Sequence, residues 1–261
     1  MTELMGVVNV TPDSFSDGGL YLDPEAAIAH GRELAAAGAE ILDVGGESTR
    51  PGADPVGEEE ELRRVVPVIR GLSGSRSRIS VDTSKAAVAA DALDAGAEIV
   101  NDVTALRGDP EMAGLCAERG ATVVLMHMLG EPRTMQEDPR YEDVVDAVKA
   151  FLAERLEAAV AAGVAEERVW LDPGIGFGKT GAHNMELLRR LGELCELGRP
   201  LVVGTSRKSF IGRVDGSPAD QRLGGTIASS VLAAAEGADV LRVHDVAEMR
   251  QALAVATAVL G

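Results

Sequence analysis

Positive charge is scarce in this sequence. Its 261 residues hold 42 Asp and Glu against 25 Lys and Arg, which gives a formal net charge of −17 at pH 7. Nucleic acids and anionic membranes are bound through broad basic surfaces, so this acid excess argues against both as general partners. Net charge does not forbid one small basic pocket.

Cysteine and long apolar runs are scarce as well. Cys116 and Cys195 stand far apart, without a CxxC motif or a neighbouring histidine, and we expect two small packed side chains rather than a metal or redox site. No apolar run approaches the roughly 20 residues that a membrane-spanning helix needs. The opening MTELMG has no basic segment leading into an apolar one, as a signal peptide would. We therefore expect a soluble, cytoplasmic protein with no membrane partner.

What the sequence does contain is a repeat of short apolar runs. Eight such runs, rich in β-branched residues, lie at 4–9, 40–44, 78–83, 98–103, 122–127, 168–172, 200–206 and 239–244. They do not alternate apolar with polar residues, so both faces of each strand should be buried. That pattern is typical of a parallel sheet covered by helices.

Segments with helical spacing separate these runs. They lie at 24–38, 59–72, 85–96, 110–120, 141–163, 185–198, 223–237 and 246–261. Four junctions, for example AAAGAEILDV, place a glycine between helix and strand, where a left-handed residue ends the helix. Eight strand–helix units match a closed (β/α)8 TIM barrel, which is typically about 250 residues long. An open doubly wound sheet also alternates, but eight strands without a linker favour closure, with 1–261 as a single α/β domain.

Acidic and amide residues stand where the strands should end. In such a barrel the active site lies at the C-terminal face, so side chains at the strand ends share one mouth. Four acidic or amide residues fall in the last residues of a predicted strand: Asp43, Asp82, Asn101 and Asp172. Buried carboxylates need hydrogen-bond partners, and a ligand rich in N–H donors would supply them.

Positive residues gather in the loops after the second, seventh and eighth strands. They are Arg50, Arg207, Lys208, Arg242 and His244. The last two loops of such barrels frequently hold phosphate, and an arginine presents a planar fork to it. For Arg207 an ion pair within the protein is an equal alternative. We expect one cavity, negative at its floor and positive at its rim.

The glycine-rich segment GIGFGKT, residues 174–180, superficially resembles a phosphate-binding P-loop but does not match that motif. That motif requires glycine where Pro173 stands. The segment is also misplaced for a dinucleotide fingerprint, which belongs to a first strand–turn–helix unit.

Taken together, the loop sequences resemble those of the dihydropteroate synthase family of pterin-binding enzymes. The segments that carry the resemblance are NVTPDSFSDGG, DVGGESTRPGA, SVDTSK, NDV, LMHM, LDPGIGFGK, GTSRKSFIG and RVHDV, and they span almost the whole chain in the family's order. The resemblance implies a transferase of folate biosynthesis. It would condense (7,8-dihydropterin-6-yl)methyl diphosphate, the pterin pyrophosphate, with 4-aminobenzoate (p-aminobenzoate), using Mg²⁺ and acting as a homodimer.

The resemblance also implies roles for individual residues. Asp82, Asn101, Asp172 and Lys208 would bind the pterin. Asn9, Thr49, Arg50, Arg242, Val243 and His244 would bind the pyrophosphate, and Asn9 would also ligate Mg²⁺. Phe15, Pro51, Phe177 and Ser209 would bind p-aminobenzoate. Catalysis would rest on Asp82, Asp172, Lys208 and Asp17.

The expected reaction is a largely dissociative substitution. Cations at the rim would stabilise the leaving pyrophosphate, and carboxylates would stabilise the pterin methylene cation. Asp17 and Phe15 would fold over the mouth and exclude water, which would otherwise hydrolyse that cation.

Two alternatives remain. A pterin-dependent methyltransferase should lack the STRPG and SRKS segments, and both are present. A catalytically silent pterin-binding relative should lack residues required for turnover, and none is missing.

Overall fold

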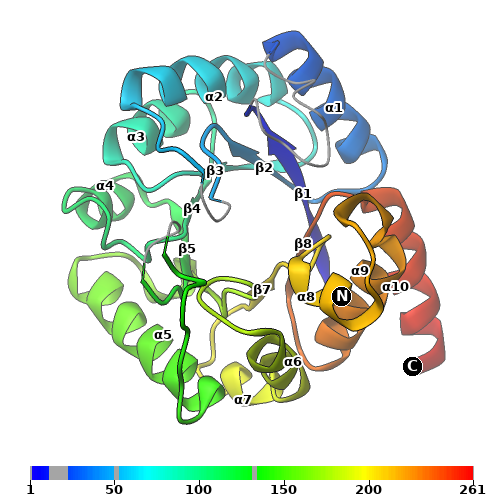
Figure 1. The fold of residues 1–261 in the computed structure, drawn as a ribbon. Helices are drawn as coiled ribbons and strands as arrows, with labels where there is room; N and C mark the ends of the chain where they lie inside the picture. The colour runs from blue at the N-terminus through cyan, green and yellow to red at the C-terminus, as the bar shows by residue number, and fades with distance from the viewer. Residues whose placement is uncertain (1, 12–22, 50–52, 131–133, 261) are drawn as a thin grey trace.

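The computed structural model describes residues 2–11, 23–49, 53–130 and 134–260. Within them, eight parallel strands form a barrel ringed by helices, which confirms the expected (β/α)8 fold (Figure 1). The strands are β1 (Glu3–Asn9), β2 (Ile41–Gly45), β3 (Arg78–Asp82), β4 (Ile99–Asp102), β5 (Thr122–Met126), β6 (Val169–Asp172), β7 (Val202–Val203) and β8 (Val240–Val243).

The barrel closes between its sixth and seventh strands by a minimal contact. The hydrogen-bonded order is β6-β5-β4-β3-β2-β1-β8-β7. An isolated parallel bridge joins Leu171 to Leu201, and the N–H of Leu171 donates to the carbonyl of Pro200 at 2.9 Å. β7 is thus much shorter than the predicted run 200–206, because its polar second half turns into the loop that carries Lys208.

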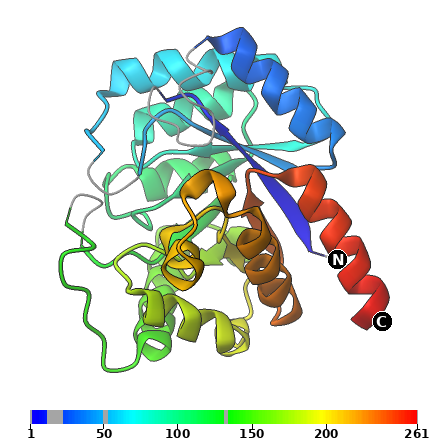
Figure 2. The same cartoon turned by 45° about the vertical axis from the view of Figure 1, so that its right-hand side comes forward.

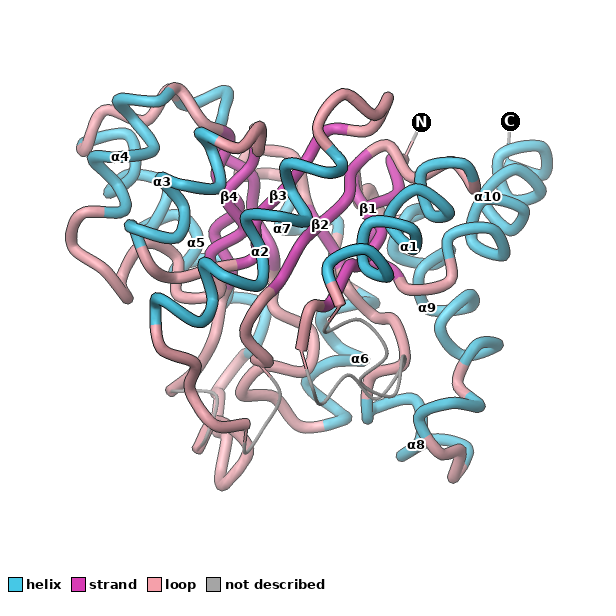
Figure 3. Tube along the Cα trace, turned by 90° about the horizontal axis from the view of Figure 1, so that it is seen from above, coloured by secondary structure: helices cyan, strands magenta, loops and turns pink. Residues whose placement is uncertain are grey.

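The helices are α1 (Pro24–Ala36), α2 (Glu58–Leu72), α3 (Ala86–Asp94), α4 (Met112–Arg119), α5 (Val144–Ala161), α6 (Gly181–Arg189), α7 (Gly192–Cys195), α8 (Ser209–Asp215), α9 (Leu223–Ala235) and α10 (Val246–Leu260). Figure 2 shows α10 beside β1 and α9, with which it is in contact. The start of β1 and the end of α10 lie at one end of the barrel, and α8 lies at the other (Figure 3). None of the helices in the described part of the chain is long and apolar enough to cross a membrane.

The helices differ from the predicted segments in two places. The segment 185–198 is two helices rather than one, because α6 begins earlier, at Gly181, and ends at Arg189. Its start is fixed by a capping box in which Thr180 and His183 each accept the other's backbone N–H. α8 was not predicted, since seven residues interrupted by Gly212 are too short to show a helical period.

Strand geometry explains why the polar strand ends share one space. Successive side chains on a strand point to opposite faces, so every second residue enters the barrel. An apolar layer fills the lower interior: Met5, Ile41, Ile99, Val124, Trp170, Val202 and Val240. Two residues further along the same strands stand Asp43, Asn101, Asp172 and Arg242. The polar layer therefore lies directly above the apolar layer.

The same alternation sends other residues outward. Asp102 follows Asn101 and faces the helices, where its carboxylate accepts from the N–H of Thr104 and of Leu106, both at 2.8 Å. Val243, with no exposed surface, belongs to the core between the barrel and its helices. Neither side chain enters the mouth.

The apolar layer inside the barrel predicts a stability effect. Ile99→Ala leaves a cavity in a layer where Ile99 is only 1% exposed, so urea unfolding should show a loss of about 2–5 kcal/mol. Val214→Ala on α8, where the side chain is 69% exposed, is the control and should change stability by less than about 0.5 kcal/mol. Equal effects of the two changes would contradict the layered interior.

Candidate active site

An arginine crosses the barrel mouth and joins two buried carboxylates. Nε of Arg242 donates to Oδ2 of Asp43 at 2.6 Å, and Nη2 donates to Oδ2 of Asp82 at 2.8 Å. Nδ2 of Asn101 donates to the same oxygen of Asp43 at 3.1 Å. Four strands, β2, β3, β4 and β8, are thereby tied together through their inward side chains.

This network corrects one expectation. Arg242 was placed at a positive rim above a negative floor, but it lies among the acids and pairs with them. The reason is alternation along β8, which gives Arg242 the same inward direction as the acids have on their strands. Unpaired carboxylates would be costly at this depth, so the arginine offsets their desolvation.

Burial sets the protonation behaviour of the acids. It raises the pKa of Asp82 to about 7, against the opposing effect of the Arg242 guanidinium. It also raises the pKa of Asp172, which the nearby Lys208 opposes. Oδ1 of Asp43 is buried without a hydrogen-bond partner. A ligand with several N–H groups would add hydrogen bonds to these carboxylates and favour their ionised forms.

Lys208 lies at the barrel mouth, at the N-terminal end of α8. Its Nζ donates to the carbonyl of Ile175 and lies 4.9 Å from the centre of the Phe177 ring. Burial lowers the pKa of Lys208 to about 8, although Asp172 favours the charged form. The loops after β6 and β7 thus bring a cation, an aromatic ring and a carboxylate together.

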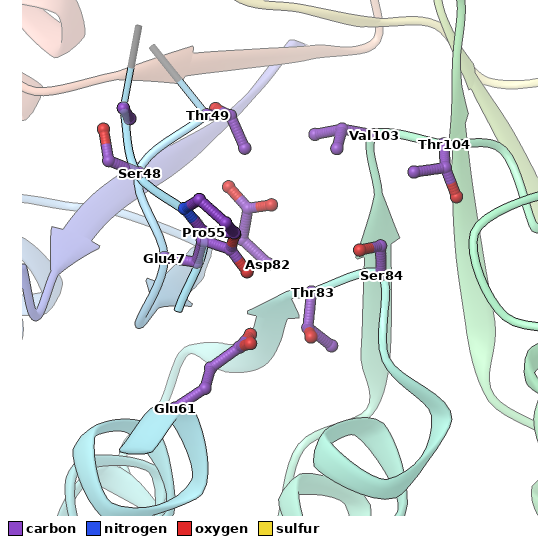
Figure 4. A pocket seen from close by; sticks show the side chains of 11 residues that line it. Glu47, Ser48, Thr49, Pro55, Glu61, Asp82, Thr83, Ser84, Val103 and Thr104 are labelled. Carbon is purple, nitrogen blue, oxygen red and sulfur yellow. The ribbon is translucent and has the colours of Figure 1, made fainter. Parts of the chain in front are cut away.

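A cavity of about 370 Å³ opens beside this network. It is lined by Glu47, Ser48, Thr49, Ala53, Pro55, Glu61, Asp82, Thr83, Ser84, Val103 and Thr104. Figure 4 shows Asp82 near its centre, with Thr49 from the loop after β2 and Glu61 approaching from α2. Thr49 and Asp82, predicted to bind opposite ends of one substrate, thus line the same cavity.

Sequence reasoning missed an ion-pair cluster in the wall of this cavity. Nζ of Lys85 donates to Glu47, in the loop after β2, and to Glu61 on α2. Glu61 is fully buried although it ends a run of four glutamates. A signal was present: Glu61 precedes Val65 by four residues, which puts it on the buried stripe of the helix.

His244 is oriented by a serine. Oγ of Ser206 lies 2.9 Å from Nδ1 of His244, and the backbone N–H of His244 donates to the same hydroxyl at 3.3 Å. A hydroxyl that accepts that N–H can donate to Nδ1, which leaves the proton of the neutral ring on Nε2. Arg207 makes an ion pair within the protein, which was the expected alternative to phosphate binding. Its Nη2 lies 2.5 Å from Oδ1 of Asp245.

The remaining predicted residues fall into three groups. Asn9 ends β1 with the inward direction of Met5, and Ser209 begins α8 at an exposed position. The side chain of Val243 points away from the mouth. Four predicted residues lie outside the described part of the chain: Phe15, Asp17, Arg50 and Pro51.

The chain is similar to known proteins over almost its whole length. A family model described as pterin binding enzyme matches residues 5–244. The dihydropteroate synthase of Escherichia coli K12 is 47% identical over 258 residues, which cover 98% of this chain and 91% of that protein.

Solved structures agree with this. Yersinia pestis dihydropteroate synthase in complex with a sulfonamide drug has a TM-score of 0.97 at 46% identity, over 99% of this chain and 94% of that one. The Xanthomonas albilineans enzyme in complex with 7,8-dihydropteroate has a TM-score of 0.89 at 48% identity, over 100% of this chain and 94% of that one.

The acid–arginine network predicts a stability effect that depends on pH. Arg242→Met leaves Asp43 and Asp82 as uncompensated buried carboxylates, so it should cost about 3–5 kcal/mol. Without Arg242 the pKa of Asp82, already about 7, rises further. The folded variant then binds more protons than the unfolded chain, and its stability falls as pH rises through neutrality. Urea unfolding should therefore show a larger loss at about pH 8 than at about pH 5.

The control is Arg140→Met, which removes an exposed ion pair with Asp138. It should leave stability unchanged at both pH values. A loss from Arg242→Met that does not vary with pH would contradict the assignment to buried carboxylates.

Proposed function

The chain belongs to the dihydropteroate synthases, within the pterin-binding enzymes, and from this membership we infer how its barrel mouth carries out their reaction. The chain is a transferase of folate biosynthesis that joins (7,8-dihydropterin-6-yl)methyl diphosphate to 4-aminobenzoate and releases diphosphate. The observation that carries the residue roles below is the barrel mouth, where Arg242 bonds to the buried Asp43 and Asp82 and where Asp82 also lines the cavity.

We propose that Asp82, Asn101, Asp172 and Lys208 hold the pterin. The amino-pyrimidine edge of a pterin is rich in N–H donors. The carboxylates of Asp82 and Asp172 each accept a bond from the protein, from Arg242 and from the N–H of Gly174, and can accept further bonds from such a ligand. The ammonium of Lys208 can donate to a ring carbonyl or nitrogen. Binding then exchanges the cost of burying the acids for charge-assisted hydrogen bonds.

The pyrophosphate end is assigned to Asn9, Thr49, Arg50, Arg242 and His244. Arg242 has five N–H donors, and its bonds to Asp43 and Asp82 use two of them. His244 is aligned by Ser206 to offer its Nε2 proton. Val243 contributes through its backbone only, because its side chain packs against the helices.

We propose Mg²⁺ as the cofactor, with Asn9 as its protein ligand. The described residues contain no cluster of three or more histidine, cysteine, aspartate or glutamate side chains that could hold a metal. Mg²⁺ commonly takes only one or two protein ligands and completes its shell with water and substrate phosphates, so one amide oxygen fits. When bound, the ion stabilises charge on the leaving group.

The chemistry follows from the charges at the two ends of the substrate. The C–O bond to pyrophosphate breaks and its electron pair leaves with the oxygen, where Arg242 and His244 stabilise the negative charge. Asp82 and Asp172 stabilise the methylene cation that remains. The aniline nitrogen of p-aminobenzoate, placed by Phe177 and Ser209 with Phe15 and Pro51, forms the new C–N bond and loses a proton. Asp17 acts with Phe15 to exclude water from the cation.

We propose that the protein is a cytoplasmic homodimer, joined through α9 and α10. These neighbouring helices expose large apolar side chains: Leu232 is 62% exposed, Val255 60% and Val259 77%. Val255 and Val259 are four residues apart and therefore share one face of α10, and exposed apolar side chains on neighbouring helices are typical of an interaction surface. The acid surface remains unsuited to nucleic acid.

The dimer proposal predicts a change in sedimentation. The wild type should sediment as a dimer, and Leu232→Glu combined with Val255→Glu should give a folded monomer, because two charges cannot be buried unpaired. Val214→Glu on α8, also exposed, is the control and should leave the dimer intact. A wild-type monomer would contradict the proposal.

The residue roles predict the outcome of a turnover assay. Protein with Mg²⁺ and pterin pyrophosphate should release pyrophosphate only when p-aminobenzoate is present. Asp82→Asn and Lys208→Met should each lower kcat/KM by about 100-fold or more, because each removes a charged contact to the reacting molecule. Lys149→Met removes an exposed ion pair to Glu196 on the outer helices, and it should match the wild type.

Other outcomes identify the alternatives. Pterin binding without pyrophosphate release would indicate the catalytically silent relative. Transfer of a methyl group from a methylated pterin would indicate the methyltransferase. Unchanged kcat/KM in both site variants would remove the assigned roles while leaving the reaction itself intact.

A further inference from the structure

Lys179 is a lysine with almost no access to solvent. It is 1% exposed and lies at the end of the loop after β6. Its Nζ lies 2.8 Å from Nδ1 of His127 and donates to the carbonyls of Gly174 and Phe177, each at 2.9 Å. Burial lowers the pKa of Lys179 to about 7, although the nearby Asp172 favours its charged form. In that form the ammonium has three N–H donors, which match the three acceptors at these distances. None of the roles assigned above uses this residue.

The acceptor on His127 is available at any physiological pH. Burial and the nearby Lys179 lower the pKa of His127 to about 3, so its ring is neutral. A neutral imidazole can present Nδ1 as an acceptor when its proton is on Nε2. The ring is also held by an edge contact to Phe151, with centres 4.9 Å apart. Lys179 is thus anchored to a rigid group at the end of β5.

The loop that Lys179 closes is pressed against the loop after β5. Gly174 has φ +65°, and a Cβ there would lie 1.9 Å from the carbonyl oxygen of His127. A Cβ on Gly178 would lie 2.7 Å from the carbonyl oxygen of Leu129. The two backbones are therefore in direct contact at two glycines, and Lys179 bonds to both sides of that contact.

The same loop presents its other face to the proposed pterin site. The N–H of Gly174 donates to Oδ1 of Asp172 at 2.7 Å. The carbonyl of Ile175 accepts from Lys208, and the Phe177 ring lies beneath the same ammonium. Residues 174–177 thus connect the buried ammonium of Lys179 to the ammonium of Lys208 without direct contact between the two.

We propose that Lys179 is a positioning residue for the active site: by fixing the carbonyls of Gly174 and Phe177 to His127, it sets the place of Lys208 and of the Phe177 ring. This inference rests on the proposed roles of Lys208 and Phe177. Without the three bonds the loop loses its side-chain attachment to His127, and the Ile175 carbonyl and the Phe177 ring can shift relative to Lys208. A displacement of about 1 Å in such a group can cost on the order of 100-fold in rate.

The test combines single and double variants. Lys179→Met keeps an unbranched side chain, one atom shorter than lysine, and removes all three donors, so kcat/KM should fall by about 10- to 100-fold. Lys179→Gln keeps an amide with two donors and should show a smaller loss. Tyr141→Phe removes a different bond to the same loop, from the Tyr141 hydroxyl to the Gly178 carbonyl. It should stay within about threefold of the wild type, because Gly178 lies outside the segment that contacts Lys208.

A double-variant cycle separates positioning from general destabilisation. If Lys179 acts through Lys208, Lys179→Met should lower kcat/KM by a clearly smaller factor in the Lys208→Met background than in the wild type, since one of the two groups that it positions is already gone. A merely structural role predicts the same fold-change in both backgrounds. Thermal unfolding and circular dichroism of each variant confirm that folded protein is compared.

The outcomes are distinct from those of the proposed function. If the wild type releases no pyrophosphate with p-aminobenzoate, the function fails. If the wild type turns over but Lys179→Met matches it, or loses equally in both backgrounds, the positioning role is overturned. Should Lys179→Met not fold, Lys179→Gln carries the same cycle with Lys208→Met, and additive losses there overturn the proposal.

Discussion

Closing eight parallel strands into a ring forces every second side chain into a shared interior, and the site depends on that constraint. Side chains at the same height on different strands become neighbours, whatever their separation in sequence. Arg242 and Asp43 are 199 residues apart and meet within hydrogen-bond distance for this reason. The apolar layer below them, which includes Ile99 and Trp170, fills the rest of the interior and holds the strand ends apart.

A crowded interior of this kind must balance its charges. Asp43, Asp82 and Asp172 are buried, and each faces a cation on another strand or loop. The balance is incomplete, because Oδ1 of Asp43 has no partner and the pKa of Asp82 is raised to about 7. A ligand that brings N–H donors to these carboxylates recovers part of that cost, which makes the mouth suited to a pterin.

Backbone contact between neighbouring loops supplies the positional accuracy that such a site needs. The loop after β6 lies so close to the loop after β5 that only glycine fits at Gly174. A buried lysine, rather than an apolar side chain, then holds the two backbones together because their carbonyls need donors. The contact between these two loops therefore sets the positions of Lys208 and Phe177.

Much of the fold could be predicted from the sequence, because it depends on local pattern. Continuous apolar runs marked buried parallel strands, and glycines after the helices marked their ends; Gly38, Gly96, Gly120 and Gly237 all have left-handed φ. The length of β7 and the division of 185–198 into two helices were missed, since hydrogen bonding between strands and capping by Thr180 decide them.

For the candidate site, too, some features were predictable from the sequence and others depended on the tertiary structure. Which polar residues reach the carboxyl ends of the strands was determined by sequence order alone, and Asp82, Asn101, Asp172 and Lys208 do so. Which of them pair, and which turn outward, was decided by the closed barrel: Arg242 joined the acids, and Val243 went to the helices. Burial of Lys179 and Glu61 was likewise a tertiary outcome, because a charged side chain is buried only where distant segments supply its partners.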